Sequence, residues 1–212
     1  MSGYLRDAAA LARKDLLLEL RGRELLPSMA LFVIATLVAF RFALTAEQEA
    51  ASQGLLWVAI LFTALLGLGR AFVPEREQGI LDALVLAPCD RSAIWLGKVL
   101  ATMAFLVVVE AVALPAFALF FGGVSAPTVA AVALANVGIC AVGTLLAAMA
   151  VAGRAREVLL PLLFLPLAIP VVVGGVGATV ADDPGRYLAF LGLYDGVFAI
   201  LAWATFEYVV VE

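Results

Sequence analysis

The charged side chains that could bind a partner are concentrated in one polar stretch of an otherwise apolar chain, Arg70–Lys98. Four of the thirteen basic residues and four acids fall in it: Arg70, Arg76, Arg91, Lys98, Glu75, Glu77, Asp82 and Asp90. Pro74 suits the first turn of a helix, because backbone N–H groups in that turn have no hydrogen-bond partner within the helix and proline lacks this group. Glu75 and Glu77 follow in that turn, near the positive end of the helix dipole. The stretch therefore predicts a helix that begins at Pro74.

The residues that follow predict that this helix is short and amphipathic. Its apolar side comprises Ile80, Leu81, Leu84 and Val85, and its polar side comprises Glu75, Gln78 and Asp82. Pro88 ends the pattern, so the helix is too short to cross a bilayer and should lie at a membrane surface or against a partner. The alternative is a solvated loop helix without a partner. Gly79 either allows close approach of another backbone or is a tolerated weak point in the helix.

The apolar segments of the chain contain several polar residues, among them Arg41, Glu110, Asn136 and Asp195. An ionisable group at membrane depth is unfavourable by about 3 kcal/mol or more, and it usually faces the interior of a helix bundle. Glu110 is therefore either a gating or substrate-path residue or one partner of an interhelical hydrogen bond, with Asn136 or Arg41 as the other. Arg41 is close enough to the outer end of its segment for its long side chain to reach the interface.

The chain contains no histidine, which removes bis-histidine haem ligation, the usual zinc and copper sites and most acid–base schemes. Cys89 and Cys140 are too far apart in predicted membrane depth for a disulfide or a redox pair. No phosphate-binding G-x-x-x-x-G-K-[ST] sequence occurs, so the chain should not bind ATP itself. We expect no enzyme, no catalytic residue, no metal site, no firmly bound cofactor and no nucleic-acid partner.

The composition predicts an all-α protein embedded in the lipid bilayer. The 212 residues are 65% hydrophobic with a mean hydropathy of +1.12, which excludes an ordinary soluble domain. A membrane-spanning helix needs about 20 mostly apolar residues. Six stretches qualify: Pro27–Thr45, Ala50–Gly69, Val99–Gly122, Thr128–Ala152, Val158–Ala181 and Leu188–Val211. We expect one permease-like domain over residues 1–212, with a six-span bundle at 27–212 and a coupling loop at 70–98.

The segment before the first span predicts an amphipathic interfacial helix within residues 1–26. One face carries Leu5, Ala9, Ala12, Leu16 and Leu20, and the neighbouring face carries Arg6, Arg13, Lys14 and Arg21. The helix is either a simple membrane anchor or a gating element. Outside the spans, eleven lysines and arginines fall on one side of the membrane and one on the other, so both termini and the 70–98 loop should be cytoplasmic.

Two further patterns concern the shape of the fifth span and the ends of other spans. The fifth span contains Pro161, Pro166 and Pro170, followed by three glycines. Proline removes backbone donors and glycine loosens a helix, so we expect a kink, then a break and a short re-entrant segment over Gly174–Asp183. Trp57 and Trp95 lie near span ends, as in the aromatic belts of membrane interfaces.

Several stretches resemble a known family of membrane permeases. The run Glu75–Leu84 (E-R-E-Q-G-I-L-D-A-L), Ala87-Pro88 and Leu96-Gly97-Lys98 resemble the region after the second span of ABC-2-type exporter permeases. More narrowly, the chain is similar to CcmB, the haem-exporter permease family of cytochrome c maturation. The additional matching stretches are Arg13-Lys14-Asp15-Leu16 to Arg21, Gly54–Ala59, Leu68-Gly69-Arg70, and Leu160-Pro161-Leu162 to Ile169-Pro170.

The resemblance implies a multi-pass protein of the bacterial cytoplasmic (inner) membrane, present as two permease copies. It implies a separate ATP-binding cassette subunit (CcmA-like), haem-handling membrane subunits and a periplasmic haem chaperone as partners. Haem would then be a transported or handled substrate. Coupling to the ATPase would involve the short helix, through Glu75, Glu77, Gly79, Ile80, Leu81, Asp82 and Leu84. Two other functions stay open: an ABC-2 permease that exports a lipid, polyketide or drug, and a membrane scaffold without a transport path.

Overall fold

The structure is a computed structural model, and it describes residues 2–45, 51–77, 79, 90–152 and 156–209. Within these ranges the chain is helical, with no strand. The helices are α1 (Ser2–Gly22), α2 (Leu25–Ala43), α3 (Ser52–Arg70), α4 (Val73–Glu77), α6 (Arg91–Phe121), α7 (Ala126–Ala152), α8 (Arg156–Val180) and α9 (Gly185–Val209).

Six of these helices are long and apolar enough to cross a membrane: α2, α3, α6, α7, α8 and α9. This confirms the prediction of an all-α, multi-pass membrane protein. The helix α6 differs most from its predicted span, because it begins at Arg91 and has 31 residues. Its length of roughly 46 Å at the standard helical rise exceeds the roughly 30 Å of a hydrocarbon core. Asp90 caps this extension by accepting the Ser92 backbone N–H at 2.9 Å.

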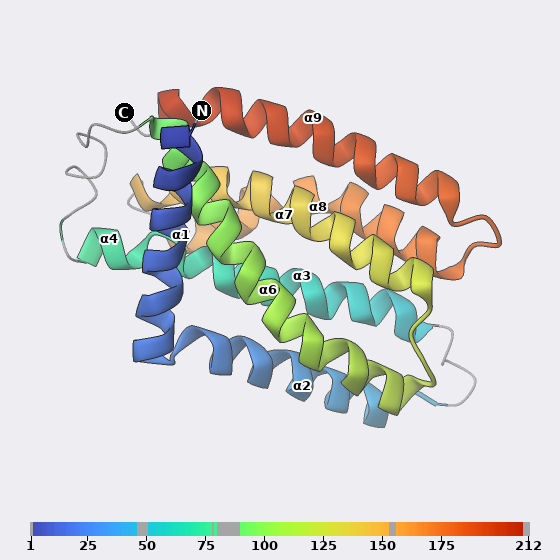
Figure 1. Ribbon diagram of the computed structural model, residues 1–212. Helices are drawn as coiled ribbons and strands as arrows, with labels where there is room; N and C mark the ends of the chain where they lie inside the picture. Colours follow the sequence, from blue (N-terminus) through green and yellow to red (C-terminus); the bar gives the residue numbers. More distant parts are fainter. Residues whose placement is uncertain (1, 46–50, 78, 80–89, 153–155, 210–212) are drawn as a thin grey trace.

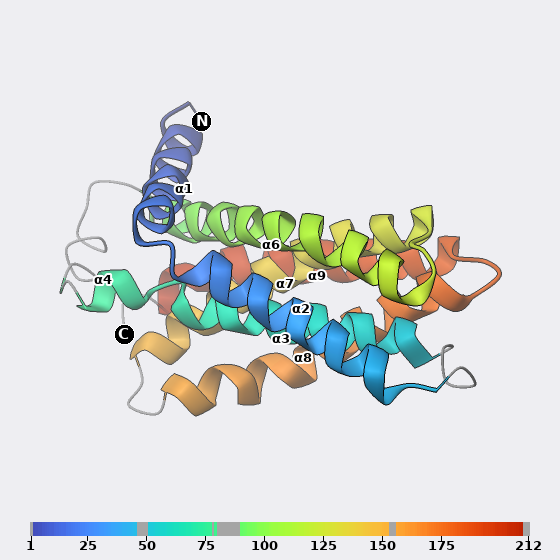
Figure 2. The same ribbon diagram turned by 90° about the horizontal axis from the view of Figure 1, so that it is seen from below.

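The six long helices run side by side, and α1 lies across one end of the bundle (Figures 1 and 2). The helix α4 and the end of α9 lie at this same end, which we call the α1 end. The short α6–α7 and α8–α9 connections lie at the opposite end. The predicted cytoplasmic segments that the structure describes are thus gathered at one end of the molecule.

The centre of the bundle is α7, which packs against α3, α6, α8 and α9. Its buried positions are mostly small residues, among them Ala131, Ala135, Ala141 and Ala147. At Gly143, a Cβ would lie 2.2 Å from a side-chain carbon of Leu68 in α3. Small residues allow membrane helices to approach closely, and α7 uses them on several sides.

The prediction of a broken fifth span is wrong, since α8 is helical from Arg156 to Val180 with all three prolines inside it. The glycines serve close packing instead. A Cβ would lie 2.8 Å from Leu191 at Gly174, 2.4 Å from Trp57 at Gly175 and 2.3 Å from Tyr187 at Gly177. Residues 174–180 therefore belong to the helix and not to a re-entrant segment.

The prediction that Trp57 and Trp95 form interfacial belts is also wrong. Trp57 is 1% exposed and packs against Gly175. Trp95 is 6% exposed, and its indole N–H donates to the Ala141 carbonyl at 3.1 Å. Both side chains fill space between helices, where a large aromatic ring buries much apolar area.

Of the helix predicted from Pro74 to Pro88, the structure describes residues 74–77 and Gly79. Its described part, α4, ends at Glu77 and is followed by Gly79 at φ 65°, a left-handed conformation that favours glycine. Among the described residues, a Cβ at Gly79 would meet nothing within 4 Å, and the approach of a partner's backbone there stays a prediction. Four of the predicted coupling residues lie outside the described residues: Ile80, Leu81, Asp82 and Leu84.

Candidate functional site

A buried lysine of α6 is the centre of an ion cluster at the α1 end. Lys98 is 2% exposed, and its Nζ donates to the Ala71 carbonyl at 2.6 Å and to Glu75 Oε1 at 2.7 Å. The same Nζ lies 2.8 Å from Asp15 Oδ2. An ammonium group has three N–H donors, so these three acceptors satisfy it completely.

Lys14 completes the cluster from α1. Its Nζ donates to Glu75 Oε1 and lies 3.1 Å from Asp15 Oδ1. Two lysines thus face two carboxylates, so the buried charges balance, as stable burial requires. Burial acts to lower the pKa of Lys14, but its hydrogen bond to Glu75 and the charges of Asp15 and Glu75 outweigh it and raise the pKa above 10.5. The charge of Lys14 therefore stabilises the fold fully below about pH 10.5, and this contribution is lost as the pH rises through the raised pKa. Burial acts to raise the pKa of Glu75, but the two lysines hold it below its usual value, so the contribution of Glu75 is lost as the pH falls through that lowered pKa.

Three separate elements supply this cluster: Lys14 and Asp15 come from α1, Glu75 from α4 and Lys98 from α6. Close contact between α1 and α6 depends on Gly97, where a Cβ would lie 2.8 Å from Leu11 Cβ and 2.9 Å from the Ala8 carbonyl oxygen. The packing and the ion pairs together fix α1 and α4 to the extension of α6.

The structure changes the place of one predicted coupling residue. Glu75 is predicted on the polar side of its helix, and in the structure it is 0% exposed and paired with two lysines of this chain. Glu77, two residues later, is exposed. Sequence reasoning did not single out Lys98, Lys14 or Asp15 as site residues. The available signal was that all three lie in stretches that carry the resemblance to the permease family.

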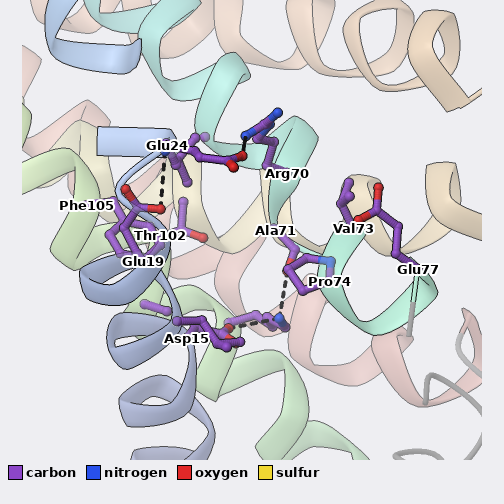
Figure 3. Close-up of a pocket in the computed structure, with 16 residues that line it drawn as sticks. Asp15, Glu19, Glu24, Arg70, Ala71, Val73, Pro74, Glu77, Thr102 and Phe105 are labelled. Atoms are coloured by element: carbon purple, nitrogen blue, oxygen red, sulfur yellow. Dashed lines mark hydrogen bonds and ion pairs between the residues drawn. The ribbon is translucent and has the colours of Figure 1, made fainter. Parts of the chain in front are cut away.

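A cavity of about 290 Å³ lies beside the cluster, between α1, the start of α2, the end of α3, α4 and α6 (Figure 3). Asp15 and Lys98, two members of the cluster, are among its lining residues. Its exposed lining residues include Glu77, Arg70 and Glu24, and Arg70 Nη1 lies 3.2 Å from Glu24 Oε2. The cavity is thus lined by charged groups of both signs at the α1 end.

Glu19 also lines the cavity, and it holds the turn between α1 and α2. Its carboxylate accepts the Leu26 N–H at 2.8 Å and the Leu25 N–H at 3.2 Å. The first N–H groups of a helix have no partner within the helix, so Glu19 satisfies two of them in α2. Arg23, at φ 52°, makes the sharp turn.

The predicted intramembrane polar residues do not form one group. Asn136 Nδ2 donates to Glu110 Oε2 at 2.6 Å, so the interhelical hydrogen bond considered from the sequence is present, and Arg41 lies elsewhere, exposed in the last turn of α2. Asp195 is 5% exposed and contacts Gly138, where a Cβ would lie 2.4 Å from its Oδ1. Both acids contact α7. Their functional roles stay predictions.

Among the described residues, no group of three or more His, Cys, Asp or Glu side chains is arranged to hold a metal ion. Cys140 is buried and free, and Cys89 lies outside the described residues. The part of the site that the structure describes is therefore suited to ion pairing between helices.

Comparison with known proteins identifies the family. The family model described as CcmB protein matches residues 6–210. This chain belongs to the CcmB family. Its relatives include the Heme exporter protein B of Pseudomonas aeruginosa, which is 34% identical over 181 residues, or 82% of this chain and 81% of that protein. The Heme exporter protein B of Rhodobacter capsulatus is 33% identical over 173 residues, covering 78% and 79% of the two chains.

The match to the CcmB family begins within α1 and ends after α9, so it includes every residue of the ion cluster. A third relative, the Heme exporter protein B of Paracoccus denitrificans, is 33% identical over 162 residues, or 73% of each chain. The family resemblance seen in the sequence is thereby confirmed.

Proposed function

We propose that this CcmB family member is a membrane component of a haem exporter in the bacterial cytoplasmic membrane. The proposal is supported by six helices suited to cross a membrane and by relatives named Heme exporter protein B. Haem is the substrate that the complex handles and not a resident cofactor of this chain. A separate ATP-binding cassette subunit supplies the energy, because this sequence lacks the glycine-rich loop that binds ATP phosphates.

The observation that carries the coupling part of the proposal is the buried ion cluster between α1, α4 and α6. Separating these elements would leave buried charges without compensation, so we propose that α1, α4 and α6 move as one unit at this end. A force that the ATPase applies to α4 at the α1 end is therefore transmitted directly to α6, which runs the length of the bundle (Figure 1). The permease needs no catalytic group for this task.

We propose two different roles for the coupling residues. Glu75 anchors α4 to the bundle, since both of its lysine partners belong to this chain. Glu77 is exposed and suited to contact the ATPase. We propose the same contact role for the segment that begins at Gly79 and includes Ile80, Leu81, Asp82 and Leu84.

The remaining partners are proposed on the family membership. They are a second copy of the permease, haem-handling membrane subunits and a haem chaperone on the outer side. The intramembrane residues Arg41, Glu110, Asn136 and Asp195 are proposed to stabilise the bundle or line the substrate path. The hydrogen bond between Asn136 and Glu110 supports the first role for these two residues.

The test is purification of the tagged permease from mild detergent, followed by identification of bound subunits and a haem absorbance spectrum. We expect an ATP-binding cassette subunit and haem-handling proteins, and we expect c-type cytochrome yield to fall when the permease is deleted. A co-purified ATPase with normal cytochrome yield would support export of a lipid, polyketide or drug instead. Absence of any ATPase would support a scaffold.

A further inference from the structure

We propose that the cavity at the α1 end binds a lysine or arginine side chain of the ATPase. The inference rests on the proposed function, because it assumes that an ATPase docks at this end. The occupant is identified by its chemistry: a single long cationic side chain that enters between α1, α3, α4 and α6 (Figure 3).

The cations that line the cavity are already paired within the chain. All three donors of Lys98 are used by Ala71, Asp15 and Glu75. Arg70 pairs with Glu24. Among the described residues, the cavity therefore has no unpaired cation to attract an anion, which disfavours a phosphate group or the carboxylates of haem.

The carboxylates that line the cavity outnumber these cations. Asp15 and Glu24 are paired with lysine or arginine, but among the described residues neither Glu19 nor Glu77 has such a partner within ion-pair distance. Glu19 accepts two N–H groups at the start of α2, whose dipole offsets part of its negative charge. The carboxylate of Glu77 thus remains available to a positively charged ligand, in a cavity whose lining carries more carboxylates than cations.

The size and the walls of the cavity suit one long basic side chain. Its volume of about 290 Å³ equals roughly ten water molecules at about 30 Å³ each. Apolar side chains supply part of the lining, including Leu18, Leu25, Val73 and Phe105. Lysine and arginine pack their methylene stems on apolar surface while the charged head meets polar groups, and the exposed Glu77 can receive that head.

The experiment measures how much ATPase stays bound to the affinity-tagged permease over a series of salt concentrations. Glu77→Lys is expected to lower retention about tenfold or more near 0.15 M salt, within the range measured for close charge pairs across interfaces. Glu77→Gln is expected to lower retention less and to flatten its salt dependence. Glu207→Gln is the matched control, because Glu207 is exposed, is paired with Arg91 and does not line the cavity.

The outcomes separate this inference from the proposed function. The cavity is supported as the binding site if the wild-type permease and the Glu207→Gln control retain the ATPase and Glu77→Lys loses it. If Glu77→Lys retains the ATPase like the wild type, with unchanged salt dependence, the cavity inference and the contact role of Glu77 are overturned, while the proposed role in a haem exporter with a separate ATPase stands. If the wild-type permease retains no ATPase at any salt concentration, both are overturned. Glu77 makes no contact in the ion cluster, and correct folding of the variants is checked by their elution as single species in detergent.

Discussion

At the scale of single residues, the ion cluster stabilises the molecule only as a complete set. Lys98 has two carboxylate partners and a carbonyl, and each carboxylate also contacts Lys14. Loss of one member leaves a buried charge without compensation, which costs more than the pair contributed. The effect of a substitution in the cluster therefore depends on what it leaves behind.

We predict that Lys98→Met destabilises the folded permease by about 3–5 kcal/mol, the usual cost of removing one partner of a buried ion pair. The double variant Lys98→Met with Glu75→Met should recover much of this loss, because Lys14 and Asp15 then still balance. The measurement is the thermal unfolding midpoint in detergent. Arg91→Met is the control: its pair with Glu207, at 3.6 Å, is exposed and should contribute less than about 1 kcal/mol. Equal midpoints for Lys98→Met and Arg91→Met would contradict the prediction.

At the scale of elements, α1 is positioned by the extension of α6 beyond the predicted span. The contact is close because Gly97 has no side chain, and Ser92 Oγ adds a hydrogen bond to Tyr4 Oη at 3.3 Å. The helix is thus packed on the bundle at the end that carries α4. This arrangement favours a mechanical role for α1 over that of a simple membrane anchor.

We predict that Gly97→Val releases α1 from α6, because a Cβ would lie 2.9 Å from the Ala8 carbonyl oxygen, which belongs to the backbone and cannot rotate away. Overpacking of this kind usually costs about 1–3 kcal/mol. The measurement is faster amide hydrogen exchange in α1. Gly196→Val on α9 is the control, since a Cβ there meets nothing within 4 Å. Unchanged exchange in the Gly97 variant would show that α1 is held in another way.

At the scale of the whole molecule, the sequence alone predicts the all-α class and the six helices, among the described residues, that are long and apolar enough to cross a membrane. Length and hydropathy decide whether a segment can cross a membrane, and these are properties of each segment alone. The ion cluster could not be predicted in the same way, because Lys14 and Glu75 are 61 residues apart and Glu75 and Lys98 are 23 apart. The α8 glycines were misread for a similar reason: whether glycine breaks a helix or allows packing depends on neighbours such as Trp57 in α3 and Tyr187 in α9.

The distribution of basic residues predicts the orientation of the molecule in the membrane, with the α1 end in the cytoplasm. Eleven lysines and arginines belong to the predicted cytoplasmic segments and one to the opposite side, a bias that determines membrane topology. A fluorescent protein fused after Glu212 or inserted at Gly79, which is exposed, should therefore fluoresce in the cytoplasm. Alkaline phosphatase inserted between Gly122 and Gly123 should be active, because this turn connects α6 and α7 at the other end of the bundle. An inactive phosphatase at normal protein levels, together with no fluorescence at either site, would contradict the predicted orientation. The ion cluster would then lie on the side of the membrane opposite to any cytoplasmic ATPase.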